Sequence, residues 1–184
     1  MINSKNVIKK TVANIEEALK DLEKCSIKKV KEFEIPSTVL FDEVKVQSIF
    51  DELSKMKGRF IYIITNTGTD KSIETIRKTY SKFDISNKPR VLNITFNISR
   101  FNKKHSTKTI YVGTSKSIHS RIKQHFGYGP KRTYSMDLIH WFPEKINISL
   151  SIYKVSTNNH FAIELIEQAI WDLKEPQFGK RSGL

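Results

Sequence analysis

Residues 110–127, IYVGTSKSIHSRIKQHFG, constrain the fold most strongly because a strand-like run passes almost directly into a helix-like run. The first run is apolar and ends at Gly113. The second run carries apolar side chains at the spacing of one helical face and stops at a glycine. We therefore expect a short strand followed by a helix whose buried face consists of Ile118, Ile122 and Phe126.

The rest of the chain also alternates between helical and strand-like periodicity. Residues 91–99 and 146–155 alternate apolar with polar side chains, which is the pattern of half-buried strands. We predict an α+β fold (mixed α/β), in which a small central β-sheet of three or four strands is flanked by helices. The expected helices cover 6–25, 41–57, 71–83, 117–126 and 160–174, and the expected strands cover 59–66, 91–99, 108–113 and 146–155.

Charge indicates the kind of partner. The chain holds 32 Lys and Arg against 19 Asp and Glu, a formal net charge of +13. Such a field attracts polyanions, most commonly nucleic acid, although an anionic membrane surface or simple solubility would also fit. The single cysteine, Cys25, provides neither a disulfide framework nor a cysteine zinc site. Without a long apolar run or a signal-peptide core, we expect an intracellular, cytoplasmic protein with no membrane partner.

Two polar side chains border the apolar face of the 117–126 helix. Arg121 and His125 are four residues apart and lie at the edge of that face. An arginine there can bury its stem and present its guanidinium to a phosphate, which it matches geometrically. The alternative is an ordinary surface arginine.

A carboxylate has the same position on the last helix. Glu167 borders the apolar face of residues 160–174, whereas Glu164 points further outward. In so basic a chain, such a carboxylate either forms an ion pair or binds a hard cation. Oxygen ligation would favour Mg²⁺ or Mn²⁺.

Two tyrosines lie in the expected strands, Tyr62 in the first and Tyr111 at the end of a later one. A buried tyrosine is usually part of the core, with its hydroxyl hydrogen-bonded nearby. Beside a metal and an arginine, however, the pKa of a phenol can fall far enough for general-base catalysis.

Together, these segments resemble the GIY-YIG nuclease family. In that family a Gly-Ile-Tyr strand and a Tyr-Ile-Gly strand precede a helix with an arginine, and a later helix carries a glutamate before a Pro-x-Tyr-Asn tail. FIYIITN (60–66) and YVG (111–113) are similar to the two strands, TSKSIHSRIKQHF (114–126) to the arginine helix, and AIELIEQAIWDLKEPQFG (162–179) to the glutamate helix and tail. The resemblance covers about residues 58–180.

The resemblance implies a fold of the GIY-YIG type over residues 58–184, preceded by an N-terminal helical extension over 1–57. It implies a metal-dependent DNA endonuclease that hydrolyses phosphodiester bonds with one divalent ion per active site, Mg²⁺ or Mn²⁺. The implied catalytic residues are Tyr62 and Tyr111 for activating the water, Arg121 for the phosphate, His125 for the water or phosphate, and Glu167 for the metal.

Three departures from the family pattern stand out. Phe60 occupies the glycine position of the first motif, and Phe178 and Gly179 occupy the tyrosine and asparagine positions of the tail. Residues 67–107 also form an insert between the two tyrosine motifs. Restriction-type members are elaborated in a similar way, so we expect a type II restriction enzyme. The alternatives are a structure-specific repair, recombination or mobile-element nuclease and a DNA-binding module without catalysis.

Basic side chains around these motifs are the expected contacts to double-stranded DNA. The insert contributes Lys71, with Arg77 and Lys78, and the basic loop before the second motif contributes Lys103 and Lys104. Phosphate contacts and base stacking are also expected from GYGPKRTYS (127–135), unless that loop is merely solvated. The remaining DNA-binding candidates are Lys116, Lys131, Arg132 and Tyr134, with Tyr128 as an alternative for stacking.

The expected quaternary structure depends on the target. A short palindromic target would require a two-fold homodimer, with the helices over 6–25 and 41–57 as its interface or as extra DNA contacts. Equally, these helices would serve to cover one face of the sheet. Trp141 and Trp171 are expected in the core rather than against bases.

Overall fold

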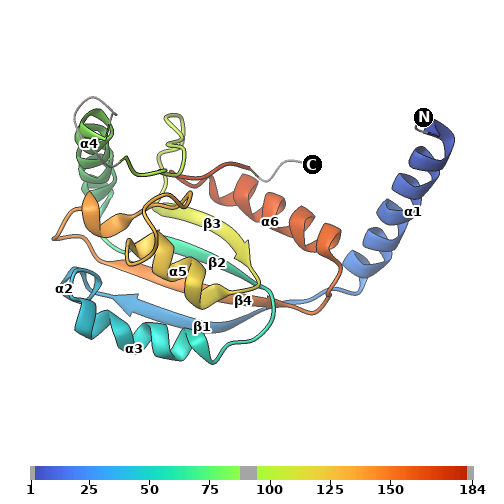
Figure 1. Cartoon of the computed structure of the whole chain (residues 1–184), viewed down its shortest axis with the longest axis horizontal. Coiled ribbons are helices and arrows are strands. Elements are labelled where there is room, and N and C mark those ends of the chain that lie inside the picture. The colour runs from blue at the N-terminus through green and yellow to red at the C-terminus, as the bar shows by residue number, and fades with distance from the viewer. Residues whose placement is uncertain (1–2, 88–94, 182–184) are drawn as a thin grey trace.

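A four-stranded antiparallel sheet forms the centre of the protein (Figure 1). The computed structural model describes residues 3–87 and 95–181. The strands β1 (Ile27–Ile35), β2 (Phe60–Asn66), β3 (Thr109–Ser115) and β4 (Ile148–Val155) lie in the order β1-β4-β2-β3. Every strand pair is antiparallel. The strand order makes β1 and β3 the two edges. The α+β class and the small central sheet are thereby confirmed.

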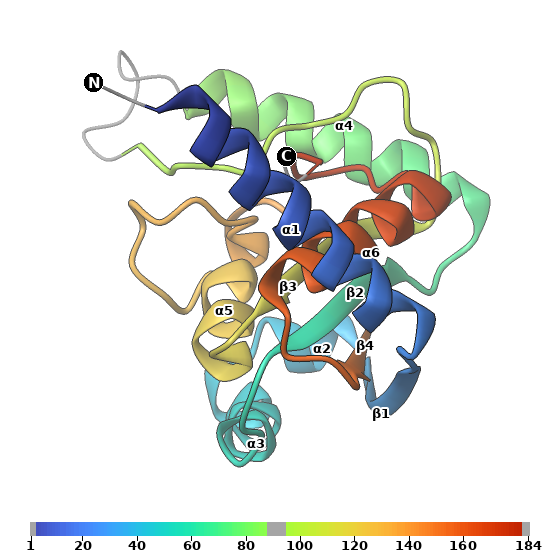
Figure 2. The same ribbon diagram turned by 90° about the vertical axis from the view of Figure 1, so that its right-hand side faces the viewer.

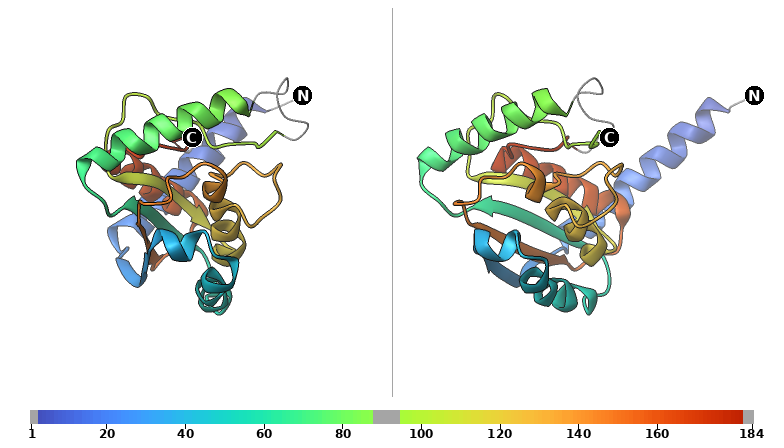
Figure 3. Two further views of the ribbon diagram at one scale, coloured as in Figure 1. Left: turned by 90° about the vertical axis from the view of Figure 1, so that its left-hand side faces the viewer. Right: turned by 60° about the vertical axis from the view of Figure 1, so that its left-hand side comes forward.

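Helices cover both faces of the sheet. On one face, α3 (Glu43–Ser54) and α5 (Ile118–Phe126) contribute to the main core together with α2 (Ser37–Leu40) and α4 (Asp70–Ser86). On the other face, α6 (His160–Lys174) buries a smaller cluster of Ile61, Val155, Ile163 and Ile166. Figure 3 shows α4 along one end of the sheet, with α2 and α3 along the other.

Most expected elements are present, with small shifts at their ends. The strands expected at 59–66, 108–113 and 146–155 are β2, β3 and β4, and the helices expected at 71–83, 117–126 and 160–174 are α4, α5 and α6. The first two expected helices correspond to α1 (Ser4–Glu23) and α3, with the short α2 added before α3. The side-chain oxygen of Asn159 accepts hydrogen bonds from the first turn of α6, as an N-cap does.

Two strand assignments differ from the sequence prediction. The strand β1 was missed: five of its nine residues are Lys or Glu, and only Phe33 and Ile35 are buried. An edge strand accepts such charges because one side of it faces solvent. The predicted strand over 91–99 is wrong within the described residues: 95–99 form no strand, and Ile98 makes only an isolated bridge to Ser135. Residues 91–94 lie outside the described residues.

The helix α1 extends away from the body (Figure 1), and in the turned view of Figure 2 it lies in front of α6. Only Ala18 of this helix is buried, and the C-terminal part of α1 approaches α6. Its apolar face is exposed over Val7, Ile8, Val12, Ile15 and Leu19. No helix in the described part of the chain is long and apolar enough to cross a membrane.

We predict that two isoleucines, one in β1 and one in α1, contribute unequally to stability. Replacing Ile35, which is 1% exposed, with alanine should lower the free energy of unfolding by about 2–5 kcal/mol because a cavity remains. Replacing Ile15, which is 49% exposed, with alanine should change it by about 0.5 kcal/mol or less. Urea denaturation of both variants tests this, and an equally large loss at Ile15 would contradict the exposed position of α1.

Candidate active site

The strands β2 and β3 bring two tyrosines onto one face of the sheet. Tyr62 is paired with Gly113, and Tyr111 is paired with Ile64, so the tyrosines are diagonal neighbours on adjacent strands. Their rings lie parallel, with centroids 6.0 Å apart and an interplanar angle of 10°. Both side chains are buried, as expected for tyrosines in sheet strands.

Gly113 provides the space that this pair needs. A Cβ atom at this position would lie 2.6 Å from the Tyr62 hydroxyl oxygen and 2.8 Å from Cε1 of Tyr111. The strand was expected to end at Gly113, but β3 continues to Ser115, and the glycine is required for the space between two side chains. Only glycine fits without displacing one of the tyrosines.

Arg121 joins the two tyrosines to the helix α5. Its Nε donates to the Tyr62 hydroxyl at 3.3 Å, and Nη2 donates to the Tyr111 hydroxyl at 3.3 Å. Its Nη1 donates to the Gln124 side chain at 3.2 Å and to the Tyr134 carbonyl at 2.8 Å. A guanidinium has five N–H groups, so these bonds leave one Nη2 N–H for a ligand. A bidentate contact between Arg121 and a phosphate would therefore require the arginine to give up one of these four bonds.

His125 is fully buried behind Tyr62 and does not reach the surface. Its Nδ1 accepts the backbone N–H of Met136 at 3.3 Å, and its Nε2 lies 2.9 Å from the Tyr62 hydroxyl oxygen. Burial, assisted by the charge of Arg121, lowers the pKa of His125 well below its usual value, so the ring is neutral. The network therefore assigns the proton to Nε2, which donates to Tyr62. The expected contact of His125 with water or phosphate is replaced by a contact with Tyr62.

Both tyrosine hydroxyl oxygens thus accept hydrogen bonds, and neither hydroxyl donates to an acceptor within the described residues. Together with the remaining N–H of Arg121, the O–H groups of Tyr62 and Tyr111 provide three donors to a ligand. Burial raises the pKa of Tyr62 well above its usual value and also raises that of Tyr111. The phenols are therefore protonated at neutral pH.

Glu167 approaches from the other face of the sheet across the edge strand β3. The hydroxyl of Thr114, next to Gly113 in β3, donates to Glu167 Oε2 at 2.7 Å. Burial raises the pKa of the Glu167 carboxyl, and the Thr114 bond opposes this. The carboxylate and Arg121 lie close enough for the arginine charge to lower the pKa of Glu167. Glu164, by contrast, lies 3.1 Å from His160 and forms a separate pair.

The surroundings of Glu167 fit a Mg²⁺ or Mn²⁺ ion bound through few protein ligands. Its Oε1 accepts no hydrogen bond from the described residues, and the side chain is half-buried. No group of three or more acidic, histidine or cysteine side chains is present among the residues described. Mg²⁺ retains several water molecules and binds through one or two carboxylates together with substrate phosphates, so a single carboxylate beside a hydroxyl suits it.

The tail of α6 supports the site through Asn102. Its side-chain amide donates to the carbonyls of Pro176 and Gly179 at 3.0 and 3.2 Å. Gly179 has a positive φ of 106°, and a Cβ there would lie 3.1 Å from the Tyr111 ring. Phe178, at the tyrosine position of the family tail, is buried in the core. The insert therefore supplies an asparagine that holds the tail against Tyr111.

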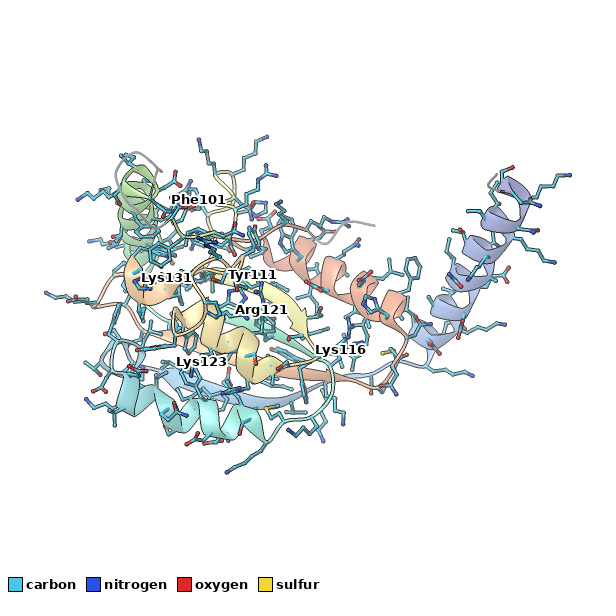
Figure 4. All side chains as sticks on the ribbon, in the orientation of Figure 1. Phe101, Tyr111, Lys116, Arg121, Lys123 and Lys131 are labelled. Carbon is cyan, nitrogen blue, oxygen red and sulfur yellow. The ribbon has the colours of Figure 1, made fainter. Side chains whose placement is uncertain are left out.

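The expected DNA-binding lysines are exposed, but they occupy several parts of the surface. Figure 4 shows Lys116 and Lys131 on opposite sides of Arg121. Lys71 lies at the start of α4, and Lys103 and Lys104 lie in the loop before β3. Arg132 is also exposed. Their exposure agrees with contact to a polyanion and does not identify it.

Three aromatic or basic side chains expected at the DNA also form bonds within the protein. The Tyr128 hydroxyl donates to the Leu40 carbonyl at 2.9 Å. The Tyr134 hydroxyl accepts the Arg100 N–H at 2.7 Å, and its carbonyl accepts from Arg121. Arg77 donates to the Lys103 carbonyl at 2.6 Å. These bonds fix the positions of the three side chains, and their contact with DNA stays a prediction.

Several functional contacts were missed in the sequence. Thr114 was assigned no role, although strand alternation places it on the α6 side of β3. The charge of Arg59 lowers the pKa of Glu167, and the sequence does not show that these two residues lie near each other. The Met136 N–H and the Tyr134 carbonyl are backbone groups, for which residue identity gives no signal.

We predict that Gly113→Ala destabilises the protein because the new Cβ would collide with both tyrosines. The loss in free energy of unfolding should be about 1–3 kcal/mol, the usual cost of overpacking. Urea denaturation measures it, and adding Tyr62→Phe should restore part of the loss because the hydroxyl is the nearest obstacle. Unchanged stability of the single variant would disprove the close packing around Gly113.

No protein-family model, curated protein or solved structure matches the chain. The chemistry of the site must therefore be argued from its own residues. These are a buried pair of tyrosines, an arginine bonded to both of their hydroxyls, a neutral histidine behind one of them, and a carboxylate across the edge strand.

Proposed function

We propose that the protein is a metal-dependent DNA endonuclease of the GIY-YIG type that hydrolyses phosphodiester bonds. The observation that supports this best is geometric: Tyr62, Tyr111 and Arg121 bring hydrogen-bond donors together beside Gly113, and Glu167 is bonded to the next residue of the same strand, Thr114. Such donors bind an anion, while a carboxylate repels one unless a cation intervenes. A phosphodiester bound together with a divalent cation satisfies both requirements.

In this proposal, Arg121 neutralises charge on the scissile phosphate through its remaining Nη2 N–H. Its four other hydrogen bonds hold the guanidinium in place, so little reorganisation is needed as negative charge develops. The Tyr111 hydroxyl donates to a phosphate oxygen. These two contacts orient the phosphate for in-line attack.

Tyr62 has the role of general base. The Nε2–H of His125 and the Nε–H of Arg121 both point at its oxygen, and both favour the phenolate. Tyr62 first loses its own proton to solvent. The phenolate then takes a proton from the attacking water while the new P–O bond forms and the P–O bond to the leaving oxygen breaks. His125 thus acts on the water only through Tyr62.

Glu167 would hold the divalent ion, with Thr114 fixing the orientation of its carboxylate. A bound Mg²⁺ or Mn²⁺ ion supplies Lewis-acid stabilisation of the phosphate and of the leaving oxygen.

The expected biological role is restriction of double-stranded DNA as a type II enzyme. A palindromic duplex target calls for a two-fold homodimer, and the exposed apolar face of α1 is a candidate interface. A structure-specific nuclease uses the same chemistry on branched DNA and does not need a dimer. A DNA-binding module without catalysis could bind phosphate through the three donors but would not need Glu167.

We predict that Glu167→Gln lowers Mg²⁺-dependent cleavage of plasmid or branched DNA by more than about 100-fold, because the carboxylate proposed to hold the ion is neutralised. Binding of uncut DNA in EDTA should remain within about twofold of the unaltered protein, because the variant removes negative charge. The matched control is Glu164→Gln, one helical turn away, which should cleave normally.

Two outcomes would count against the nuclease proposal. Equal cleavage by Glu167→Gln and the unaltered protein would show that Glu167 does not hold the metal. Binding without cleavage by the unaltered protein, in Mg²⁺ and in Mn²⁺, would favour the non-catalytic module.

We predict that cleavage becomes faster as the pH rises. Since burial raises the pKa of Tyr62, the active phenolate is a minor species at neutral pH. Its fraction grows about tenfold per pH unit below that pKa and then levels off. Single-turnover rates at saturating Mg²⁺ should follow this curve, while Tyr62→Phe should be slow and almost independent of pH. A rate that falls with rising pH would exclude Tyr62 as the base.

A further inference from the structure

A basic hollow of about 690 Å³ lies between the loop before β3 and the C-terminal tail. It is separate from the three donors of the candidate active site. One wall is the segment 100–105, and the other is formed by Trp171 of α6 and by the tail residues 179–181. Five of its ten lining residues carry a positive charge, and none carries a negative charge: Arg100, Lys103, Lys104, Lys180 and Arg181 are the cations.

Four of these cations are free to contact a ligand. Arg100, Lys103, Lys104 and Lys180 are exposed and form no ion pair with any residue that the structure describes. Arg181 is different, because its guanidinium forms two hydrogen bonds of 2.8 Å with the Asp172 carboxylate. Four unpaired cations around one hollow attract an extended anion rather than a single small one.

Aromatic rings also line the hollow. The His105 and Trp171 rings meet edge to face with centroids 5.0 Å apart, and Phe101 lies beside them in the lining. All three side chains are half-buried, so part of each remains open. Cations interleaved with half-open aromatic rings are typical of surfaces that bind single-stranded nucleic acid, where bases stack on the rings.

The hollow is rigid. Phe101 forms a bridge to Phe178, and Asn102 donates to the tail carbonyls of Pro176 and Gly179. The His105 Nδ1 lies 2.9 Å from the Pro176 carbonyl oxygen. Because both walls are joined by these bonds, little ordering would be needed when a ligand binds.

The hollow adjoins the candidate active site. The backbone of Gly179 lies against the Tyr111 ring, and the Arg100 N–H donates to the Tyr134 hydroxyl. The Lys180 ammonium lies 5.6 Å from the Tyr134 ring centroid, and the Tyr134 carbonyl holds Arg121. In Figure 4, Phe101 lies near Tyr111 and Arg121. A chain of nucleotides leaving the active site can therefore enter the hollow.

We propose that this hollow binds an unpaired DNA strand next to the scissile phosphate. The proposal rests on the proposed nuclease function. Of the two nuclease roles considered for it, the hollow favours the structure-specific one, whose substrate is DNA with a single-stranded flank, such as a flap or a branch. Lys103, Lys104 and Lys180 contact successive phosphates, and Trp171 with His105 receives a base. A fully paired duplex keeps its bases stacked inside, so it cannot use these rings.

The test compares two double variants of equal charge. Lys103→Ala/Lys104→Ala removes two cations of the hollow, and Lys28→Ala/Lys55→Ala removes two exposed lysines, one in β1 and one at the C-cap of α3. Binding of a single-stranded DNA of about 12 nucleotides is measured in EDTA by fluorescence anisotropy over a range of salt. The first variant should bind about tenfold more weakly and lose about 1.4 from the salt slope, or 0.7 for each phosphate contact. The second should resemble the unaltered protein.

Tryptophan fluorescence provides an independent readout. The protein has two tryptophans, and Trp141 is 4% exposed in the core, so quenching by stacked bases should report on Trp171. Single-stranded DNA should quench the emission, whereas polyphosphate, which carries no bases, should bind without quenching. Trp171→Phe should abolish the quenching and leave the fold intact.

Several outcomes would overturn the proposal. Equal binding by the two double variants would remove the hollow from the binding surface. Equal quenching by polyphosphate would show that no base stacks there, and tighter binding of RNA of the same sequence would reassign the ligand to RNA. If the protein cleaves paired duplex but the hollow variants bind single-stranded DNA normally, the nuclease proposal stands and the strand-binding proposal is rejected. If single-stranded DNA binds at the hollow but no DNA is cleaved, the strand-binding site stands and the nuclease proposal is rejected.

Discussion

The bonds between Arg121 and the two tyrosine hydroxyls are the interaction on which the candidate site depends. They connect the helix α5 to both β2 and β3. The Tyr134 carbonyl accepts a further hydrogen bond from the guanidinium and helps to fix it. Enclosing a charged group is costly unless it is hydrogen-bonded, and four of the five Arg121 N–H groups have partners. The packing of α5 on the sheet therefore determines the directions of all three donors.

Gly113 and His125 are the two further requirements of this arrangement. Without a Cβ at Gly113, the two tyrosine rings can lie side by side at 6.0 Å. With a neutral His125 behind it, the Tyr62 oxygen receives a second donor from the protein. Both features leave the O–H protons of the two tyrosines and one arginine N–H without a partner among the described residues.

The secondary-structure elements and several candidate site residues could be predicted from the periodicity and the residue types of the sequence. The alternation in β4 and the apolar face of α5 sufficed for the elements, and Tyr62, Tyr111 and Arg121 were candidates whose bonds the structure describes. The strand β1 was hidden because an edge position tolerates its lysines and glutamates. The role of His125 could not be predicted, since it depends on a backbone N–H of Met136 that any residue would provide.

The edge position of β3 explains why the site and the basic hollow occur together. Because β3 has a neighbouring strand on only one side, α6 can pass close to its other side and bring Glu167 to Thr114. The tail after α6 then follows the same edge: Gln177 and Phe178 donate to the carbonyls of Thr109 and Ile110. That pairing places the tail cations beside the loop that precedes β3. One edge strand thus positions the metal-binding carboxylate of the proposal and a route for an anionic strand leading away from it.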